Sequence, residues 1–197
     1  MLTEMPSRND TSLTLIESVR NNAAGAWDRF VEIYSPLIYY WCTTKAQLPR
    51  EDASDIMQDV FLSISKSIGT FRRDETYGSL RGWIRVITTN QIRSHIRHGG
   101  KEATAQGGTH AHQQLNAVPE TLLGTDDEPV ETSILMRKAL DVLRNSFSES
   151  SYQAFWLTAM EGKTTAEVAQ SLGLTESAIR QACYRVRKRL RDELDEF

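Results

Sequence analysis

The chain has 197 residues, of which 40% are hydrophobic and 25% are charged, and its formal net charge is -3 at pH 7. This composition predicts a soluble protein, long enough for two small cores. The two cysteines lack the paired spacing of a Cys-x-x-Cys zinc or redox site. With no signal pattern and no bilayer-length apolar run, we expect a cytoplasmic chain without membrane insertion.

Charge is unevenly distributed along the chain. Residues 12–98 carry 11 basic and 9 acidic side chains, residues 99–133 carry 1 and 6, and residues 134–197 carry 10 and 9. Residues 99–133 also lose hydrophobic periodicity and contain paired glycines and two prolines. We therefore predict a tail (1–11), a first domain (12–98), an acidic linker (99–133) and a second domain (134–197).

The first domain is predicted to be entirely helical. Apolar residues recur at three-and-four spacing from Trp27 to Trp41, and no strand-like alternation is apparent. Pro36 lies inside this stripe, so we expect it to kink or divide the helix, because proline removes a backbone donor.

The helix after Pro49 has an unusual polar side. Its core side is Ala53, Ile56, Val60, Ile64 and Ile68, and its opposite side is Glu51, Asp55, Gln58, Asp59 and Leu62. By composition alone, a partner-docking patch and an ordinary solvated face are equally supported, since single leucines are often exposed and acids favour a helix N-terminus.

Residues 80–97 combine a core stripe with arginines. Leu80, Trp83, Ile84 and Ile87 fit the core, and Arg81, Arg85, Arg93 and Arg97 occur without an acid between Tyr77 and His98. Basic residues beside aromatic rings suit single-stranded nucleic acid. The alternative, that Trp83 is a core residue, is favoured on frequency.

Helical periodicity resumes around Ile134, with Ser148 as a predicted cap, and leads to a helix-turn-helix pattern. Thr164 and Glu167 fit a capping box, Gly173 fits a left-handed helix end, and Thr175 can cap the next helix. The last helix has a core side of Ile179, Ala182, Cys183, Val186 and Leu190, and an opposite side centred on Ser177, Gln181, Tyr184 and Lys188. Six basic residues and no acid between Arg180 and Arg191 favour DNA binding over a cationic surface helix.

Together these patterns resemble the extracytoplasmic function (ECF) sigma factors, the small two-domain class of bacterial RNA polymerase specificity subunits. The resemblance rests on residues 27–34 with Pro36, residues 51–61, Phe71-Arg72 with residues 80–90, and the helix-turn-helix ending at 185–191. It implies an all-α fold, with a sigma region 2-type bundle and a sigma region 4-type helix-turn-helix, and the partners core RNA polymerase and promoter DNA. An anti-sigma factor is a further candidate partner.

The resemblance also implies three sets of binding residues. Core polymerase would bind Asp52, Asp55, Gln58, Asp59 and Leu62. The minus-ten element would bind Arg72, Asn90, Arg93 and Arg97, together with the loop from Arg72 to Ser79. The minus-thirty-five element would bind Glu176, Ser177, Arg180, Gln181, Tyr184, Arg185 and Lys188. Gln58-Asp59 departs from the Gln-Glu common in the family, and the recognition helix departs near Cys183, so the promoter sequence does not carry over.

For the linker, the resemblance suggests that Asp126, Asp127 and Glu128 lie near the RNA channel as an RNA-like placeholder. Alternatively, these acids keep the segment soluble or fold back on the DNA-binding faces of the free protein.

Other function classes have less support. A stand-alone helix-turn-helix regulator would need a sensor or dimerisation domain, which residues 12–98 do not resemble. We expect no enzyme, because no nucleophile set or phosphate-binding loop is visible. We also expect no cofactor and no metal site, since His95, His98, His110 and His112 lie at a helix end and in the linker without a nearby cysteine.

Overall fold

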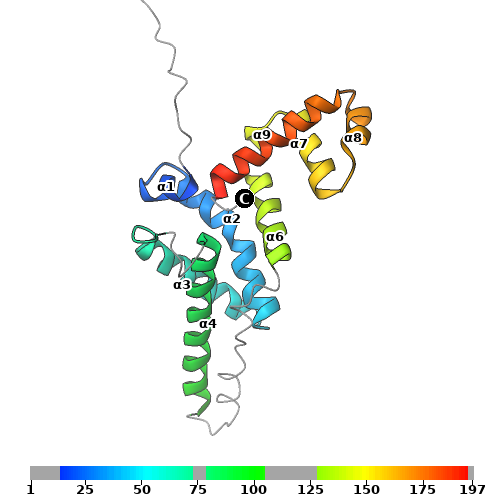
Figure 1. Ribbon diagram of the computed structural model, residues 1–197. Coiled ribbons are helices and arrows are strands. Elements are labelled where there is room, and N and C mark those ends of the chain that lie inside the picture. The colour runs from blue at the N-terminus through cyan, green and yellow to red at the C-terminus, as the bar shows by residue number, and fades with distance from the viewer. Residues whose placement is uncertain (1–13, 73–78, 105–127, 195–197) are drawn as a thin grey trace, which may run out of the picture.

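The computed structural model describes residues 14–72, 79–104 and 128–194, and all regular structure in these ranges is helical (Figure 1). The all-α prediction is confirmed. The elements are α1 (Leu15–Arg20), α2 (Ala26–Tyr40), a π-helical turn η1 (Trp41–Lys45), α3 (Arg50–Ser67), α4 (Leu80–Thr104), α6 (Glu128–Val142), a 3-10 turn η3 (Arg144–Ser146), α7 (Glu149–Phe155), a second π-helical turn η4 (Trp156–Met160), α8 (Thr165–Leu172) and α9 (Glu176–Leu194).

Helix α2 continues through Pro36 and is not divided there. Proline removes one donor from the helix, but apolar side chains on both sides of it, including Tyr34 and Leu37, are fully buried. Packing of this apolar face therefore outweighs the lost hydrogen bond, since burial of each large side chain is worth about 1.5–3 kcal/mol. The predicted division at Pro36 is wrong.

The main hydrophobic core draws on both sides of the predicted linker. It contains apolar side chains of α1, α2, α3 and α4, together with Leu135, Ala139 and Leu140 of α6 and the C-terminal end of α9. Helix α6 packs along α2, and α9 reaches α1 (Figure 1). A second, smaller core of Ala154, Val168, Ala169, Ile179 and Ala182 lies in the helix-turn-helix. Two cores are present, but the first is shared by both predicted domains.

Helical structure enters both ends of the segment predicted as a linker. Helix α4 extends to Thr104, and α6 begins at Glu128, six residues before the predicted restart at Ile134. Pro129 is tolerated in a first turn, and Glu128 and Glu131 carry negative charge where the helix dipole favours it. Asp126, Asp127, His110 and His112 lie outside the described residues.

The helix-turn-helix forms through the predicted caps. Thr164 and Glu167 make a reciprocal capping box, and Gly173 adopts φ 65°, the left-handed region that favours glycine. The Thr175 hydroxyl accepts a hydrogen bond from the Ala178 amide at 3.2 Å, and Ser148 caps α7. Hydrogen bonds from the backbone and side chain of Thr164 lower the pKa of Glu167. The charged form of this carboxylate therefore supports the start of α8 above the ordinary glutamate range and loses that effect as the pH falls through its lowered pKa.

The two cysteines lie in different surroundings. Burial raises the pKa of Cys42 to about 12, so its thiol stays protonated at neutral pH. Cys183 is half-buried, with its sulfur 3.2 Å from the Thr158 hydroxyl. In the described ranges, no helix has the length and apolarity needed to cross a membrane.

Candidate functional site

The predicted docking side of α3 is open to solvent. Ala53, Ile56, Val60 and Ile64 are buried on the opposite side. Asp55, Gln58 and Asp59 are exposed, and Leu62 has 53% of its surface exposed. The predicted amphipathic pattern is confirmed. An apolar side chain therefore stands among acids on the outside of the bundle, as a docking patch requires.

Asp52 differs from the other four predicted docking residues. It is half-buried, and its carboxylate lies 3.6 Å from His95 Nε2 of α4. Gln91 of α4 also donates a hydrogen bond to the Ser63 hydroxyl at 2.9 Å. These contacts tie α3 to α4, so the predicted polymerase-docking and minus-ten faces lie on two helices that pack as one unit.

On α4, the predicted minus-ten residues lie at or near the surface. Asn90 and Arg97 are exposed, and Arg93 is partly exposed. Trp83 is buried, with its ring centroid 5.0 Å from that of Phe71. The core interpretation of Trp83 is therefore confirmed, and this indole is not available to stack on a base.

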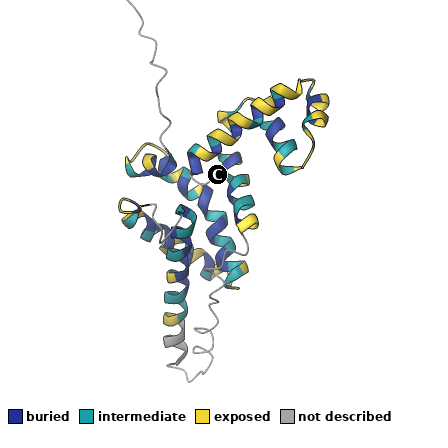
Figure 2. Cartoon of the chain, viewed as in Figure 1, coloured by how far each residue is buried: buried dark blue, intermediate teal, exposed yellow. Residues whose placement is uncertain are grey.

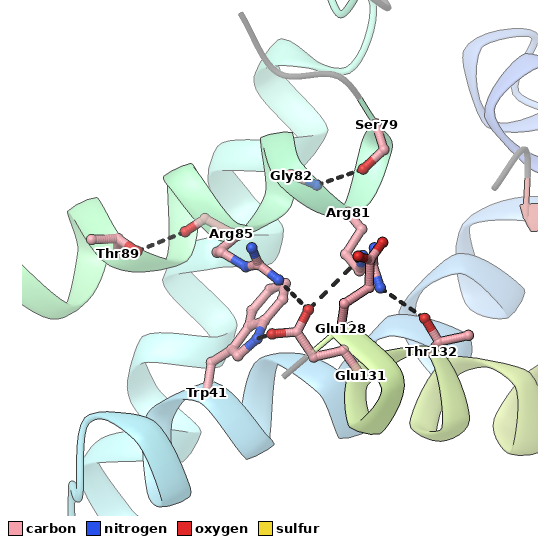
Figure 3. A network of polar contacts seen from close by, with 9 residues as sticks. All are labelled: Trp41, Ser79, Arg81, Gly82, Arg85, Thr89, Glu128, Glu131 and Thr132. Carbon is pink, nitrogen blue, oxygen red and sulfur yellow. Dashed lines mark hydrogen bonds and ion pairs between the residues drawn. The ribbon is translucent and has the colours of Figure 1, made fainter. Parts of the chain in front are cut away.

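The other two arginines of α4 point toward α6 (Figure 3). The Glu131 carboxylate is 2% exposed and forms an ion pair with Arg85. Trp41 Nε1 also donates a hydrogen bond to Glu131 Oε1 at 2.8 Å. Arg81 donates to Glu128 Oε1 at 2.9 Å and to the Thr132 hydroxyl at 3.0 Å. Of the four arginines noted in the sequence, Arg81 and Arg85 thus bind the chain's own acids.

Glu131 was not among the residues predicted from the sequence. The helical spacing could have indicated that Glu131 is buried. It lies four residues before Leu135 and eight before Ala139, and both of these residues are fully buried. Farther along α6, Lys138 donates to Glu32 of α2 at 2.8 Å, and this hydrogen bond raises the pKa of Lys138. Polar contacts therefore accompany the apolar packing of α6 against α2.

Arg72 begins the predicted minus-ten loop. Its side chain is exposed and donates hydrogen bonds to the Gly69 carbonyl at 3.2 Å and to the Phe71 carbonyl at 2.9 Å. The remainder of that loop, residues 73–78, lies outside the described residues.

The outer side of α9 is exposed along its length, while its inner side is buried (Figure 2). The exposed residues include Glu176, Ser177, Arg180, Gln181, Tyr184, Arg185 and Lys188, and Tyr184 has 64% of its surface exposed. Arg180 pairs with Glu176 at 3.0 Å, and Arg185 contacts the Ser151 hydroxyl at 3.4 Å. The predicted polar face of the recognition helix is therefore present and accessible.

No group of three metal-binding side chains comes together within the described ranges. His95 contacts Asp52, and His98 lies 2.7 Å from the Ser94 carbonyl. In these ranges the predicted binding surfaces are exposed helix faces.

Comparisons with known proteins match both halves of the chain. Residues 30–102 match the Sigma-70 region 2 family, and residues 151–190 match the Sigma-70, region 4 family. The first match contains the exposed face of α3 and the predicted minus-ten residues of α4. The second contains α8 and most of α9.

Curated relatives match over most of the chain. The ECF RNA polymerase sigma factor SigE of Mycolicibacterium smegmatis is 25% identical over 199 residues, which cover 96% of this chain and 70% of that protein. SigM of Mycobacterium tuberculosis is 30% identical over 140 residues, covering 71% and 63%. BldN of Streptomyces coelicolor is 26% identical over 188 residues, covering 91% and 66%. The matched length is thus 63 to 70% of these relatives.

Proposed function

The chain belongs to the ECF class of RNA polymerase sigma factors, and we propose that it binds core RNA polymerase and directs promoter recognition and DNA opening. One observation carries this proposal. Three helix faces are exposed to solvent, and they follow one another along the chain in the order expected for the family. These are the acidic face of α3, the polar face of α4 and the outer face of α9.

We propose that polymerase docks on α3 through Asp55, Gln58, Asp59 and Leu62. Asp52 would contribute at the edge, because it already contacts His95. An anti-sigma factor stays a candidate partner.

We propose that Asn90, Arg93 and Arg97 of α4, with Arg72, bind the minus-ten element. Arginines hold phosphates, and an exposed amide can hydrogen-bond to unstacked bases. Since Trp83 is buried and Arg81 and Arg85 are paired with α6, these residues have no part in this surface as described.

For the acidic segment, we propose that Glu128 ties its end to α4 and does not serve solubility alone. The Glu128–Arg81 ion pair supports this role, and Arg81 lies outside the proposed minus-ten surface. The placement of Asp126 and Asp127 near an RNA channel stays a prediction.

The direct test of the function is transcription by purified core polymerase with and without this chain. We expect specific initiation only when the chain is present, at promoters selected from a randomised library. Equal initiation in both reactions, or binding of the chain alone to a palindromic site as a dimer, would favour the stand-alone regulator instead.

In the minus-thirty-five element, we expect Arg180 to read bases and Lys188 to hold phosphates. The N-terminal end of a recognition helix enters the major groove most deeply, and Arg180 lies one turn into α9. Arg180→Ala should relax preference at one or two base pairs by about 1–3 kcal/mol. Lys188→Ala should weaken all promoters alike and reduce the salt slope by about one unit.

Selection over randomised minus-thirty-five sequences checks this assignment, with Lys188→Ala as the matched control on the same helix. An Arg180→Ala protein that returns the parent's sequence preference would refute it.

A further inference from the structure

Arg20, the last residue of α1, holds the end of a different helix. Its Nε donates a hydrogen bond to the Ile68 carbonyl at 3.0 Å, and its Nη2 donates to the Phe71 carbonyl. Ile68 is the C-cap of α3. Carbonyls at a helix end lack intrahelical partners, and an arginine that donates to them also complements the helix dipole. Arg20 therefore fixes how the chain leaves α3.

Three residues contact Phe71 through its carbonyl or its ring. Arg72 also donates to its carbonyl, at 2.9 Å, and its ring packs against Trp83 in the first turn of α4. The Arg20 guanidinium lies 6.0 Å from the centre of the same ring. One arginine of α1 thus links the end of α3 to the beginning of α4.

The far end of the same loop is also fixed. The Ser79 hydroxyl accepts a hydrogen bond from the Gly82 amide at 3.0 Å, and the Ser79 carbonyl accepts one from the Trp83 amide at 3.0 Å. Residues 73–78 connect these two anchored ends. Arg72 follows Phe71 directly and donates to the same carbonyl as Arg20, so the position of Arg72 depends on the upstream anchor, to which Arg20 supplies two charged hydrogen bonds.

We propose that Arg20 is a positioning residue for minus-ten recognition. By fixing Ile68 and Phe71, it sets the position of Arg72, and it acts through Arg72 without contacting DNA itself. The inference rests on the proposed function and deepens it, because it assigns a specificity role to α1, which carries none of the predicted binding residues.

The surroundings of Arg20 allow this role to be separated from folding. Arg20 lines a pocket of about 620 Å³ between the α1–α2 turn and the end of α3, with Asn22, Trp27 and Ser65 among the other lining residues. Truncation of a half-exposed side chain beside an open pocket leaves space that water can enter, so the core is not left with a dry cavity.

The test uses the reconstituted holoenzyme and a promoter fragment that the parent holoenzyme selects from a randomised library. The fragment is prepared as a full duplex of the minus-thirty-five region and as a fork with the minus-ten non-template strand single-stranded. For Arg20→Ala, we expect about tenfold weaker binding to the fork, because the charged hydrogen bonds that fix Phe71, and with it Arg72, are lost. Base preference within the minus-ten element should flatten. Affinity for core polymerase and for the upstream duplex should stay within about twofold of the parent, since those faces are untouched.

Two further variants complete the test. Arg20→Lys keeps the charge but loses the planar guanidinium that donates to two carbonyls, so it should recover only part of the binding to the forked DNA. Arg137→Ala removes an exposed arginine of α6 that lies over the Trp156 ring, and it should leave fork binding unchanged.

Fork binding by Arg20→Ala within about twofold of the parent would overturn the proposal. A parallel loss of core affinity and thermal stability would overturn it as well, because it indicates a purely structural role. Full recovery by Arg20→Lys with parental salt dependence would indicate direct phosphate binding and would also overturn it. If the parent holoenzyme selects no promoter, the proposed function itself fails, which is a distinguishable result.

Discussion

Glu131→Ala is expected to lower the free energy of unfolding by about 3–5 kcal/mol, the largest loss of stability for any single substitution considered for this protein. Glu131 is 2% exposed, and its carboxylate joins α6 to both Arg85 of α4 and Trp41 of η1. Alanine would remove the buried negative charge that faces the Arg85 guanidinium and the acceptor of the Trp41 indole. The cost comes mainly from these two desolvated partners.

The double variant Arg85→Met with Glu131→Leu is expected to be much closer to the parent than Glu131→Ala. Two apolar side chains of similar volume avoid the burial of a single charge, and such replacements of buried ion pairs are often neutral or stabilising. The Arg85 guanidinium also lies 5.4 Å from the Trp41 ring, where the thioether of methionine can still pack.

Urea unfolding of the parent, Arg85→Met, Glu131→Leu and the double variant measures this coupling as a double-mutant cycle, and Glu131→Ala is measured beside them. Glu128→Ala is the matched control, because Glu128 is also a glutamate of the first turn of α6 but its side chain is 62% exposed. We expect a change below about 1 kcal/mol for Glu128→Ala, because the Glu128 carboxylate is open to solvent. A similarly small change for Glu131→Ala would mean that the packing of α6 on α2 does not depend on this carboxylate.

Local patterns explain why much of the fold was predictable. The stripes of α3 and α9 follow three-and-four spacing, and each predicted core residue on them is buried except Cys183, which is half-buried. The caps at Ser148, Thr164, Gly173 and Thr175 depend only on residues one to four positions away. Interactions of this range can be read from the chain directly.

Contacts distant in sequence were not predictable in the same way. Glu131 meets partners 46 and 90 residues earlier, and nothing in its own neighbourhood specifies them. The pattern showed a glutamate in an acidic segment, whereas the structure shows it buried on the side of α6 that faces Trp41 and Arg85. Similarly, the count of charges grouped Arg81 and Arg85 with Arg93 and Arg97 as basic residues suited to nucleic acid. Such a count cannot determine which side of a helix another segment will cover.

The second large effect concerns the exposed face of α3. Asp55→Arg combined with Leu62→Ala is expected to weaken binding to core polymerase by about 2 kcal/mol or more, roughly 30-fold. Leu62 is an apolar side chain with 53% of its surface exposed, and Asp55 is an exposed acid on the same side of the helix. Buried at an interface, Leu62 would contribute its apolar surface, and Asp55 would oppose a basic partner surface. Reversal of the charge would replace that attraction with repulsion.

The fold of this double variant should be preserved, since exposed substitutions usually change stability by less than about 0.5 kcal/mol. Titration of labelled chain with core polymerase at several salt concentrations measures both affinity and its electrostatic part. The matched control is Asp141→Arg with Val130→Ala, which changes one exposed acid and one exposed apolar residue on α6.

If reversing one acid and removing one exposed apolar side chain weakened binding at any position, both double variants would lose affinity equally. If the α3 face is the docking surface, only the Asp55 and Leu62 variant should lose affinity, and its salt dependence should fall because an acid that faces a basic surface has been removed. Parental affinity of that variant, with thermal unfolding unchanged, would show that the α3 face is an ordinary solvated surface. Polymerase would then have to bind through another part of the chain.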